Sequence, residues 1–439
     1  MRKGLARSAI LLLTPPVFAL AQNQTPPPAQ VPQPATQIKL PVPTQRLSLD
    51  DAIRLALQHN HALQALRSTI LQNHAQEITA NLRPNPVLSW DAQFLPIFEP
   101  DKFTSDWLDN QAQFDLGISY LFEIGKKRQH RLQAAKDATE QTRWQVTDNE
   151  RQVAFNVAQQ FIAALLAQST LEFAEQDLKS FQQTVDISEA RRKAGDMSEG
   201  DLLKIKLQLL QFQTDVASAQ VAKVQALAAL RQLLGFESVA DAFDVAGDLD
   251  YEAVRGGVDE FKAMALRSRP DLMAARQGVI AAQSAEKLAE ANVYRDLGTT
   301  FNYSHISSTN TGAFFFNIQL PIFDRNQGEV ARTKYVITQN QELAQEASQQ
   351  VLTDVVDAYY SLRTNDEIIQ LYRGGYVDYA KQSRDISEYA YKRGAVSLLD
   401  YLDSERSYRA NQLAYRQALA NYMVAVEQMR QAVGSRNLP

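Results

Sequence analysis

Apolar positions recur with helical spacing over most of the chain after residue 46. The pattern predicts a helix from about 47 to 82, ended by the prolines that follow, and a very long helix from about 126 to 193. Within the long helix, Leu171, Leu178 and Val185 keep the seven-residue spacing that is typical of coiled coils. At about 1.5 Å per residue this helix would extend for roughly 100 Å, which predicts a rod rather than part of a compact core.

Four shorter segments alternate apolar and polar residues instead. This period-2 pattern predicts strands over about 86–97, 111–122, 297–306 and 312–322, arranged as two hairpins. Their length and aromatic residues are typical of transmembrane β-hairpins, although a soluble hairpin on a core has the same alternation. The residues predicted to face lipid are Trp90, Phe94, Phe114, Leu116, Ile118, Tyr120, Phe301, Tyr303, Phe314, Phe316 and Ile318. Those predicted to face the lumen are Asp91, Gln93, Gln113, Asp115, Asn302 and Asn317.

The two hairpins lie at equivalent points of an internal repeat. Gly195 and Gly394 are 394 − 195 = 199 residues apart, and Arg231 and Arg430 have the same offset. An apolar stripe keeps this register, so the chain is predicted to be a duplicated helical-hairpin unit. The predicted parts are a first repeat over 47–235, a connector over 236–257 near the middle of the helical part, a second repeat over 258–434 and a tail over 435–439.

Four strands cannot close a barrel, and an open sheet edge in lipid leaves backbone groups without hydrogen bonds. Several copies must therefore contribute strands: two copies would give eight and leave no lumen, whereas three would give 12 and leave one. The predicted fold class is mainly α with a membrane β part, a homotrimer of long coiled-coil helices with a 12-stranded transmembrane β-barrel. A periplasmic coiled-coil adaptor or scaffold with a small β domain is the alternative.

The first residues have the pattern of an export signal. Three basic residues precede a short apolar run, and Ala19-Leu20-Ala21 gives the small-x-small pattern of a cleavage site. We therefore predict a cleaved signal peptide over 1–21 and a Pro-rich tether over 22–46. No later stretch has the about 20 apolar residues of a transmembrane helix. Any contact with a membrane is accordingly assigned to the strands.

Composition excludes several kinds of chemistry. The 439 residues include 45 basic and 50 acidic side chains, a formal charge of −5, which argues against binding to nucleic acid. Cysteine is absent, which excludes disulfides, thiol catalysis and lipid attachment through cysteine. There is no phosphate loop, zinc-protease motif or Gly-x-Ser-x-Gly, and the five histidines are scattered. We predict no enzymatic activity, no cofactor and no dedicated metal site.

Several motifs follow one another in a fixed order. They are Leu47-Ser48-Leu49-Asp50-Asp51-Ala52, Leu82-Arg83-Pro84-Asn85-Pro86, the run Leu320 to Glu329, and Lys392-Arg393-Gly394 leading to Leu399-Asp400-Tyr401-Leu402-Asp403. Together they resemble the outer-membrane efflux proteins, a family of TolC-like channel trimers. Glu123-Ile124-Gly125-Lys126-Lys127-Arg128 and the run from Phe323 to Glu329 resemble the heavy-metal (cobalt–zinc–cadmium type) branch of that family.

The resemblance implies a passive exit duct in the outer membrane of a Gram-negative-type bacterium. Its 12-stranded barrel would continue into a trimeric α-barrel of long coiled-coil helices, a helical tunnel through the periplasm. The duct would pair with a periplasmic adaptor and an inner-membrane pump, expected to be proton-driven. Metal cations or small toxic compounds are the expected cargo. A TolC-like duct for polypeptide secretion is the alternative.

Two glycine turns are the candidate contact sites of the helical part. Gly195 with Asp196, and Gly394 with Ala395, are predicted to reverse the long helices at the end away from the barrel. There they would contact the adaptor, together with Asp201 near the first turn.

Two aspartates after the second turn are the candidate gate. Asp400 and Asp403 would each occur three times around the axis of a trimer, where closely spaced carboxylates repel one another. The resemblance also implies aspartates at the periplasmic constriction. A plain solvated helix face is the alternative interpretation of these two residues.

Overall fold

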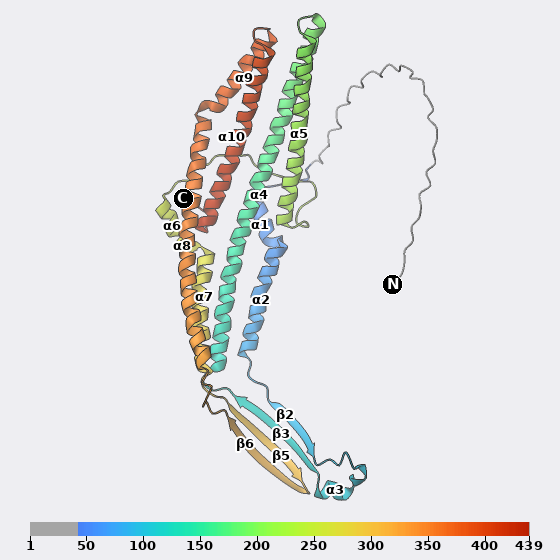
Figure 1. Cartoon of the computed structure of the whole chain (residues 1–439), viewed down its shortest axis with the longest axis vertical. Helices are drawn as coiled ribbons and strands as arrows, with labels where there is room; N and C mark the ends of the chain where they lie inside the picture. Colours follow the sequence, from blue (N-terminus) through green and yellow to red (C-terminus); the bar gives the residue numbers. More distant parts are fainter. Residues whose placement is uncertain (1–42, 439) are drawn as a thin grey trace, which may run out of the picture. The chain divides into compact units, whose positions relative to one another are not determined.

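The computed structural model describes residues 43–438, so the predicted signal peptide and most of the predicted tether lie outside the described residues. The described part is mainly helical and carries one four-stranded antiparallel sheet beyond one end of its long helices (Figure 1). The predicted mainly α class is therefore confirmed.

Outside the loop between its two strands, the first repeat contains four α-helices: α1 (Leu49–His59), α2 (His61–Asn81), α4 (Lys127–Ala194) and α5 (Glu199–Leu234). The single helix predicted over 47–82 is wrong, because Asn60 interrupts it in an extended conformation. The Asn60 side chain accepts a hydrogen bond from the Leu63 N–H at 3.0 Å and so caps the second helix. The chain turns here without losing helical periodicity, which is why the pattern did not reveal the break.

The second repeat has the same order with one difference. It contains α6 (Val258–Ser268), α7 (Pro270–Ala291), α8 (Gln327–Leu371), α9 (Val377–Lys392) and α10 (Leu398–Val433). A π-helical turn, η2 (Tyr372–Tyr376), separates α8 from α9, and Gly375 within it has a φ of 112°. Only glycine adopts this conformation readily, so the long helix of the second repeat is kinked where α4 is continuous.

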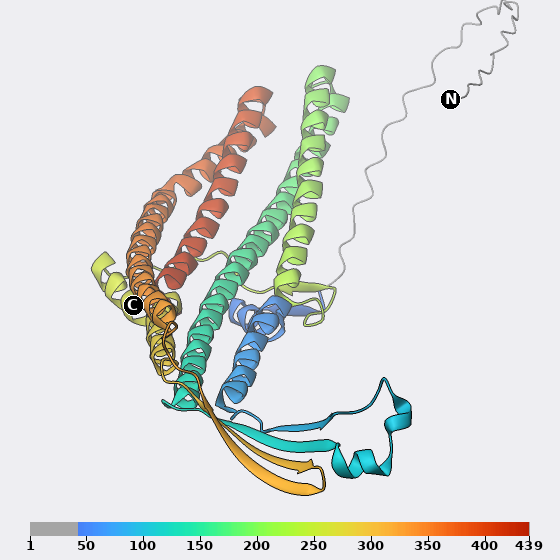
Figure 2. The same cartoon turned by 60° about the horizontal axis from the view of Figure 1, so that its bottom comes forward.

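The sheet has the strand order β2-β3-β5-β6 (Figure 2). The strands are β2 (Val87–Gln93), β3 (Gln113–Phe122), β5 (Leu297–Ile306) and β6 (Thr309–Ile318). The extension of the first strand to residue 97 is wrong, because Phe94 turns the chain with a φ of 59°. The loop that follows carries η1 (Pro100–Lys102) and α3 (Ser105–Asn110).

The second hairpin is tighter than the sequence analysis predicted. β6 begins at Thr309 and ends at Ile318, not over 312–322. Its connection to β5 is only Ser307-Ser308, with φ values of 45° and 64°. Two successive positive φ values are the geometry of a two-residue hairpin turn, so the polar residues that look like a loop continue the strand.

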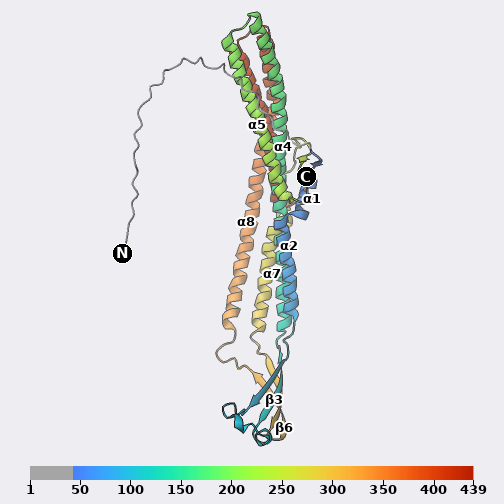
Figure 3. The same ribbon diagram turned by 90° about the vertical axis from the view of Figure 1, so that its right-hand side faces the viewer.

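Each strand continues into a helix, and the lateral order is the same in both parts. The contacts between helices next to the sheet give the order α2-α4-α7-α8, which matches β2-β3-β5-β6 because these are the helices that precede or follow those strands. Farther from the sheet the order is α9-α10-α4-α5 (Figure 1). Figure 3 shows the same chain from the side, with α2, α7 and α8 next to the sheet and α5 at the far end. The described chain is therefore one wall, four elements wide, with two free edges.

A small two-stranded sheet, which the sequence pattern did not predict, lies at the middle of the wall. β1 (Gln45–Leu47) pairs in parallel with β4 (Phe243–Val245). The predicted tether is thus wrong at its last two residues, which are a strand. β4 lies in the segment predicted as a connector, and both strands contribute to a core with α1, α4 and α5.

Candidate functional site

The register of the sheet collects apolar side chains on one face. Ile118 lies opposite Phe301, which lies opposite Phe314, and the rings of the two phenylalanines are 5.0 Å apart. The same face carries Trp90, Phe114, Leu116, Tyr120, Tyr303, Phe316 and Ile318. Trp90 is 68% exposed and Phe316 70%. This face is a continuous apolar surface with nothing in the described chain to cover it.

Phe94 does not lie on the apolar face of the sheet. It lies after the end of β2, and its carbonyl oxygen accepts a hydrogen bond of 2.9 Å from the Trp107 indole N–H. Trp107 is buried in the loop against Phe103. The assignment of Phe94 to the strand is therefore corrected: it anchors the loop, which has a small aromatic core of its own.

The opposite face carries the polar side chains of the sheet, with Phe315, Leu121 and Val87 among them toward the helices. Asp91 lies directly opposite Asp115, and Gln93 opposite Gln113. The Gln93 amide donates to both carboxylates at 3.1 Å, and the Gln113 amide donates to Asp115 at 2.8 Å. Asn302 and Asn317 lie on the same face. All the residues predicted to face a lumen thus share one side of the sheet.

Both helical tips are glycine turns. Gly195 has a φ of 87° and ends α4, and Gly394 has a φ of 74° after α9. The residue after each glycine, Asp196 or Ala395, returns its N–H to a carbonyl of the helix just completed at 2.9 Å. These are left-handed turns that satisfy the last carbonyls of a helix.

The two helices that return from the tips start in the same way. Ser198 caps α5 by accepting from the Asp201 N–H at 3.1 Å, and Ser397 caps α10 by accepting from the Asp400 N–H at 3.2 Å. Each serine hydroxyl also donates to the carboxylate of that aspartate, at 2.9 and 2.7 Å. Asp201 and Asp400 therefore both have a capping role that the sequence analysis did not foresee.

Asp403 differs from Asp400 in this respect. Both side chains are exposed. Asp403 makes only a 4.0 Å ion pair with Arg406, whose side chain is itself 79% exposed. The structure thus places the two aspartates about one helical turn apart on α10, and only Asp400 is committed to a local hydrogen bond.

Sequence reasoning missed a buried charged cluster between the two hairpins. Asp177 on α4 and Glu405 on α10 are each 5% exposed. Arg409 binds Asp177 at 2.7 Å and also contacts Asp215 on α5, while its guanidinium lies 4.1 Å from the centre of the Phe212 ring. The available signal was Glu405 one turn after Tyr401, on the side of α10 where the apolar stripe runs.

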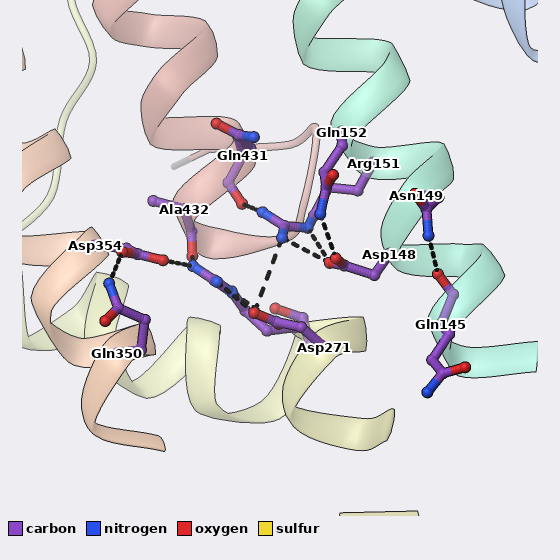
Figure 4. Close-up of polar contacts among 12 residues, drawn as sticks. Gln145, Asp148, Asn149, Arg151, Gln152, Asp271, Gln350, Asp354, Gln431 and Ala432 are labelled. Carbon is purple, nitrogen blue, oxygen red and sulfur yellow. Dashed lines mark hydrogen bonds and ion pairs between the residues drawn. The ribbon is translucent and has the colours of Figure 1, made fainter. Parts of the chain in front are cut away.

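A second polar network joins the two repeats at mid-height (Figure 4). Arg269 is 3% exposed and binds Asp271 on α7, Asp354 on α8 at 2.8 Å and the Ala432 carbonyl at the end of α10. On α4, Arg151 binds Asp148 at 2.6 Å and lies 3.9 Å from Asp271. Burial opposes ionisation of Asp271, but the hydrogen bond and charge of Arg269 outweigh it and lower the pKa of that carboxyl.

The described residues lack two further features. Between residues 43 and 438, no three His, Cys, Asp or Glu side chains gather in a way that could hold a metal ion. In the same part of the chain, no helix combines the length and apolar character needed to cross a membrane.

The geometry defines the class of protein. A sheet with one apolar and one polar face, continued strand by strand into long paired helices, has the fold of outer-membrane channel protomers. A crystal structure of CusC superimposes with a TM-score of 0.72 and 21% identity, covering 95% of this chain and 99% of that one. The chain belongs to the family described as outer membrane efflux protein, whose sequence profile matches residues 52–236 and 263–435.

Two relatives connect the chain with the metal branch of the family. It is 28% identical over 271 residues to the cation efflux system protein CusC of Escherichia coli K12, and the match covers 57% of each protein. It is 24% identical over 365 residues to the cobalt-zinc-cadmium resistance protein CzcC of Cupriavidus metallidurans, covering 82% of this chain and 84% of CzcC. The resemblance to metal-efflux outer-membrane components is thus confirmed.

Proposed function

We propose that the chain is one protomer of a homotrimeric duct in the outer membrane. The observation that carries the proposal is the open four-stranded sheet with its two unlike faces. The apolar face suits lipid, the polar face suits a water-filled lumen, and three copies would close 12 strands into a barrel. Closure would pair β2 of one copy with β6 of the next and so remove both free edges.

Exposed apolar stripes on the outermost helices support the same closure. On α5 the stripe includes Leu203, Leu207 and Leu210, and on α9 it includes Tyr379 and Ile386. Leu207 is 69% exposed and Ile386 68%. Because α5 and α9 lie at opposite edges of the wall, α5 of one copy would meet α9 of the next in a head-to-tail contact, which generates a ring.

The far end of the helices is the proposed coupling end. The tips at Gly195, Asp196, Asp201, Gly394 and Ala395 would contact a periplasmic adaptor, and Asp400 and Asp403 would narrow the entrance. The sequence has no nucleotide-binding motif, so the energy would come from another component. We propose that this component is an inner-membrane pump driven by protons. The duct itself is passive, with outer-membrane lipid around its barrel and the helices extending into the periplasm of a Gram-negative-type bacterium.

The proposed cargo is a metal cation or another small toxic compound. The names of CusC and CzcC support cations, and acidic side chains on the polar face of the sheet, Asp91 and Asp115, suit their passage. Secretion of polypeptides through the same architecture is the second candidate. A deletion strain separates the two: sensitivity to cobalt, zinc, cadmium or copper salts supports the first, and loss of a secreted protein with unchanged metal tolerance supports the second.

The central experiment is extraction and reconstitution of the full chain. We expect it to sediment with outer membranes, to require detergent for solubility, to run as a trimer in native mass spectrometry and to form channels in planar bilayers. A monodisperse monomer in buffer without detergent would refute the duct and favour the periplasmic adaptor or scaffold.

A further inference from the structure

The buried carboxyl pair of Asp177 and Glu405 lies where all four helices of the two hairpins meet. Asp177 is on α4, Glu405 and Arg409 are on α10, and Arg409 also reaches Asp215 on α5. From α9, Arg384 faces the pair with its side chain 14% exposed. The carboxyl groups of Asp177 and Glu405 are close enough to form one hydrogen bond when one of them is protonated.

Two arginines face the pair, and each is shared with other carboxylates. Asp177 and Asp215 bind Arg409, while Arg384 pairs with Asp385 and with Glu388, which Lys392 also binds at 2.6 Å. The remaining polar groups that face the cluster are the hydroxyls of Tyr401 and Tyr408, and Arg416 lies nearby over Phe173. An ionised Glu405 would therefore be an additional negative charge in a buried position, next to the carboxylate of Asp177.

We propose that Asp177 and Glu405 together hold one proton, and that loss of this proton weakens the contact of α10 with α4 and separates the two helical hairpins. The pair is thus a proton-binding site built into the hairpin contact. The inference rests on the proposed function only for its consequence, which is a wider entrance when the hairpins separate.

The stability of the hairpin contact depends on pH because the buried site favours the protonated form of Glu405. Burial, and next the charge of Asp177, raise the pKa of Glu405 to about 8 from its usual value of 4.5. The folded contact therefore holds a proton that the separated carboxyl would release. Its stability is full below the ordinary carboxyl range and is lost as the pH rises through about 8.

The hairpin contact can be measured without reference to channel activity. The chain has no cysteine, so single cysteines at the exposed Gln182 on α4 and Ser407 on α10 give a spin-label pair without background. The labelled full chain is diluted into unlabelled chain in detergent, so that only distances within one copy are measured. Between pH 6 and pH 9 we expect a longer distance to gain population, with its midpoint near pH 8.

Two variants test the cause. Glu405→Gln carries no ionisable proton and is expected to keep the short distance at both pH values. Glu175→Gln removes an exposed carboxylate two residues from Asp177 on the same helix and is expected to follow the native transition. If Glu405→Gln does not fold, two measurements still decide: the native transition itself, and the Asp177→Asn variant. That variant removes the charge that raises the pKa of Glu405 and should therefore move the midpoint downward.

Three outcomes would overturn the inference: a native distance that does not change between pH 6 and pH 9, a Glu405→Gln variant that opens like the native chain, or an Asp177→Asn midpoint that stays in place. Conductance in planar bilayers is a separate readout. A distance change without channel activity would refute the proposed duct and leave the proton site standing, whereas pH-independent distances in an active channel would do the reverse.

Discussion

Asn60 and Arg269 occupy the same position in the two repeats, 269 − 60 = 209 residues apart, and each ties the start of its own repeat to the end. Asn60 donates to the Leu233 carbonyl at 2.9 Å, and Arg269 donates to the Ala432 carbonyl at 3.2 Å. Both precede a helix as its N-cap. The duplication has kept the backbone geometry while replacing a neutral amide with a buried cation.

This replacement predicts unequal costs of mutation. Arg269→Met leaves Asp271 and Asp354 without their buried partner and should lower the free energy of unfolding by about 3–5 kcal/mol. Asn60→Ala removes one cap and one hydrogen bond and should cost about 1–2 kcal/mol. Urea midpoints of the detergent-solubilised variants measure both, and an Asn60→Ala variant that is the less stable of the two would contradict this account.

The Arg269 network also predicts a loss of stability in acid. The lowered pKa of Asp271 means that the unfolded chain binds more protons than the folded chain below the ordinary value of 3.8. The stabilising contribution is present above that value and is lost as the pH falls through the lower folded pKa. We expect Asp271→Asn to be less stable than the native chain at neutral pH and to lose less on acidification, as measured by thermal unfolding in acid.

Features that depend on local sequence could be predicted, whereas features that depend on contacts between distant segments could not. Alternation of apolar and polar residues predicts β5 with the bounds that the structure gives it, although the pattern is less clean there than in the first hairpin. Glycines indicate both helical tips, because the turn there requires a positive φ that glycine adopts readily. Asp177 and Glu405 are buried because α4 and α10 pack against each other at these two residues. The residue spacing within either helix does not predict this contact.

The two faces of the sheet predict opposite effects of the same charge. Leu116 and Ser119 lie on the same strand, on the apolar and the polar face respectively. Leu116→Lys should destabilise insertion by about 2–4 kcal/mol and deplete the protein from outer membranes, while Ser119→Lys should insert normally. Immunoblots of membrane fractions measure this. Equal depletion of both variants would show that the apolar face is not lipid-exposed.

The kink between α8 and α9 predicts a contrast between two neighbouring glycines. Gly375 has a φ of 112°, and a Cβ there would lie 3.3 Å from the Tyr379 ring, whereas a Cβ at Gly374 would have no neighbour within 4 Å. Gly375→Ala should cost about 1–3 kcal/mol because alanine is strained in this conformation. Gly374→Ala should be neutral or stabilising. Thermal midpoints of the two variants provide the comparison, and equal midpoints would refute the strain.

The last prediction separates gating from capping at the second tip. Asp400 accepts a hydrogen bond from Ser397, so Asp400→Asn alters the helix start as well as the charge, whereas Asp403 has only a weak exposed ion pair. If the two carboxylates narrow the entrance, Asp403→Asn should raise single-channel conductance and antibiotic uptake without lowering the thermal midpoint.

Asp201→Asn is the matched control for Asp400→Asn, because Asp201 accepts from Ser198 in the same way at the first tip but is not assigned to the constriction. It should change the stability of the tip as Asp400→Asn does and leave conductance unchanged. Native conductance in Asp403→Asn would assign this aspartate to a solvated helix face.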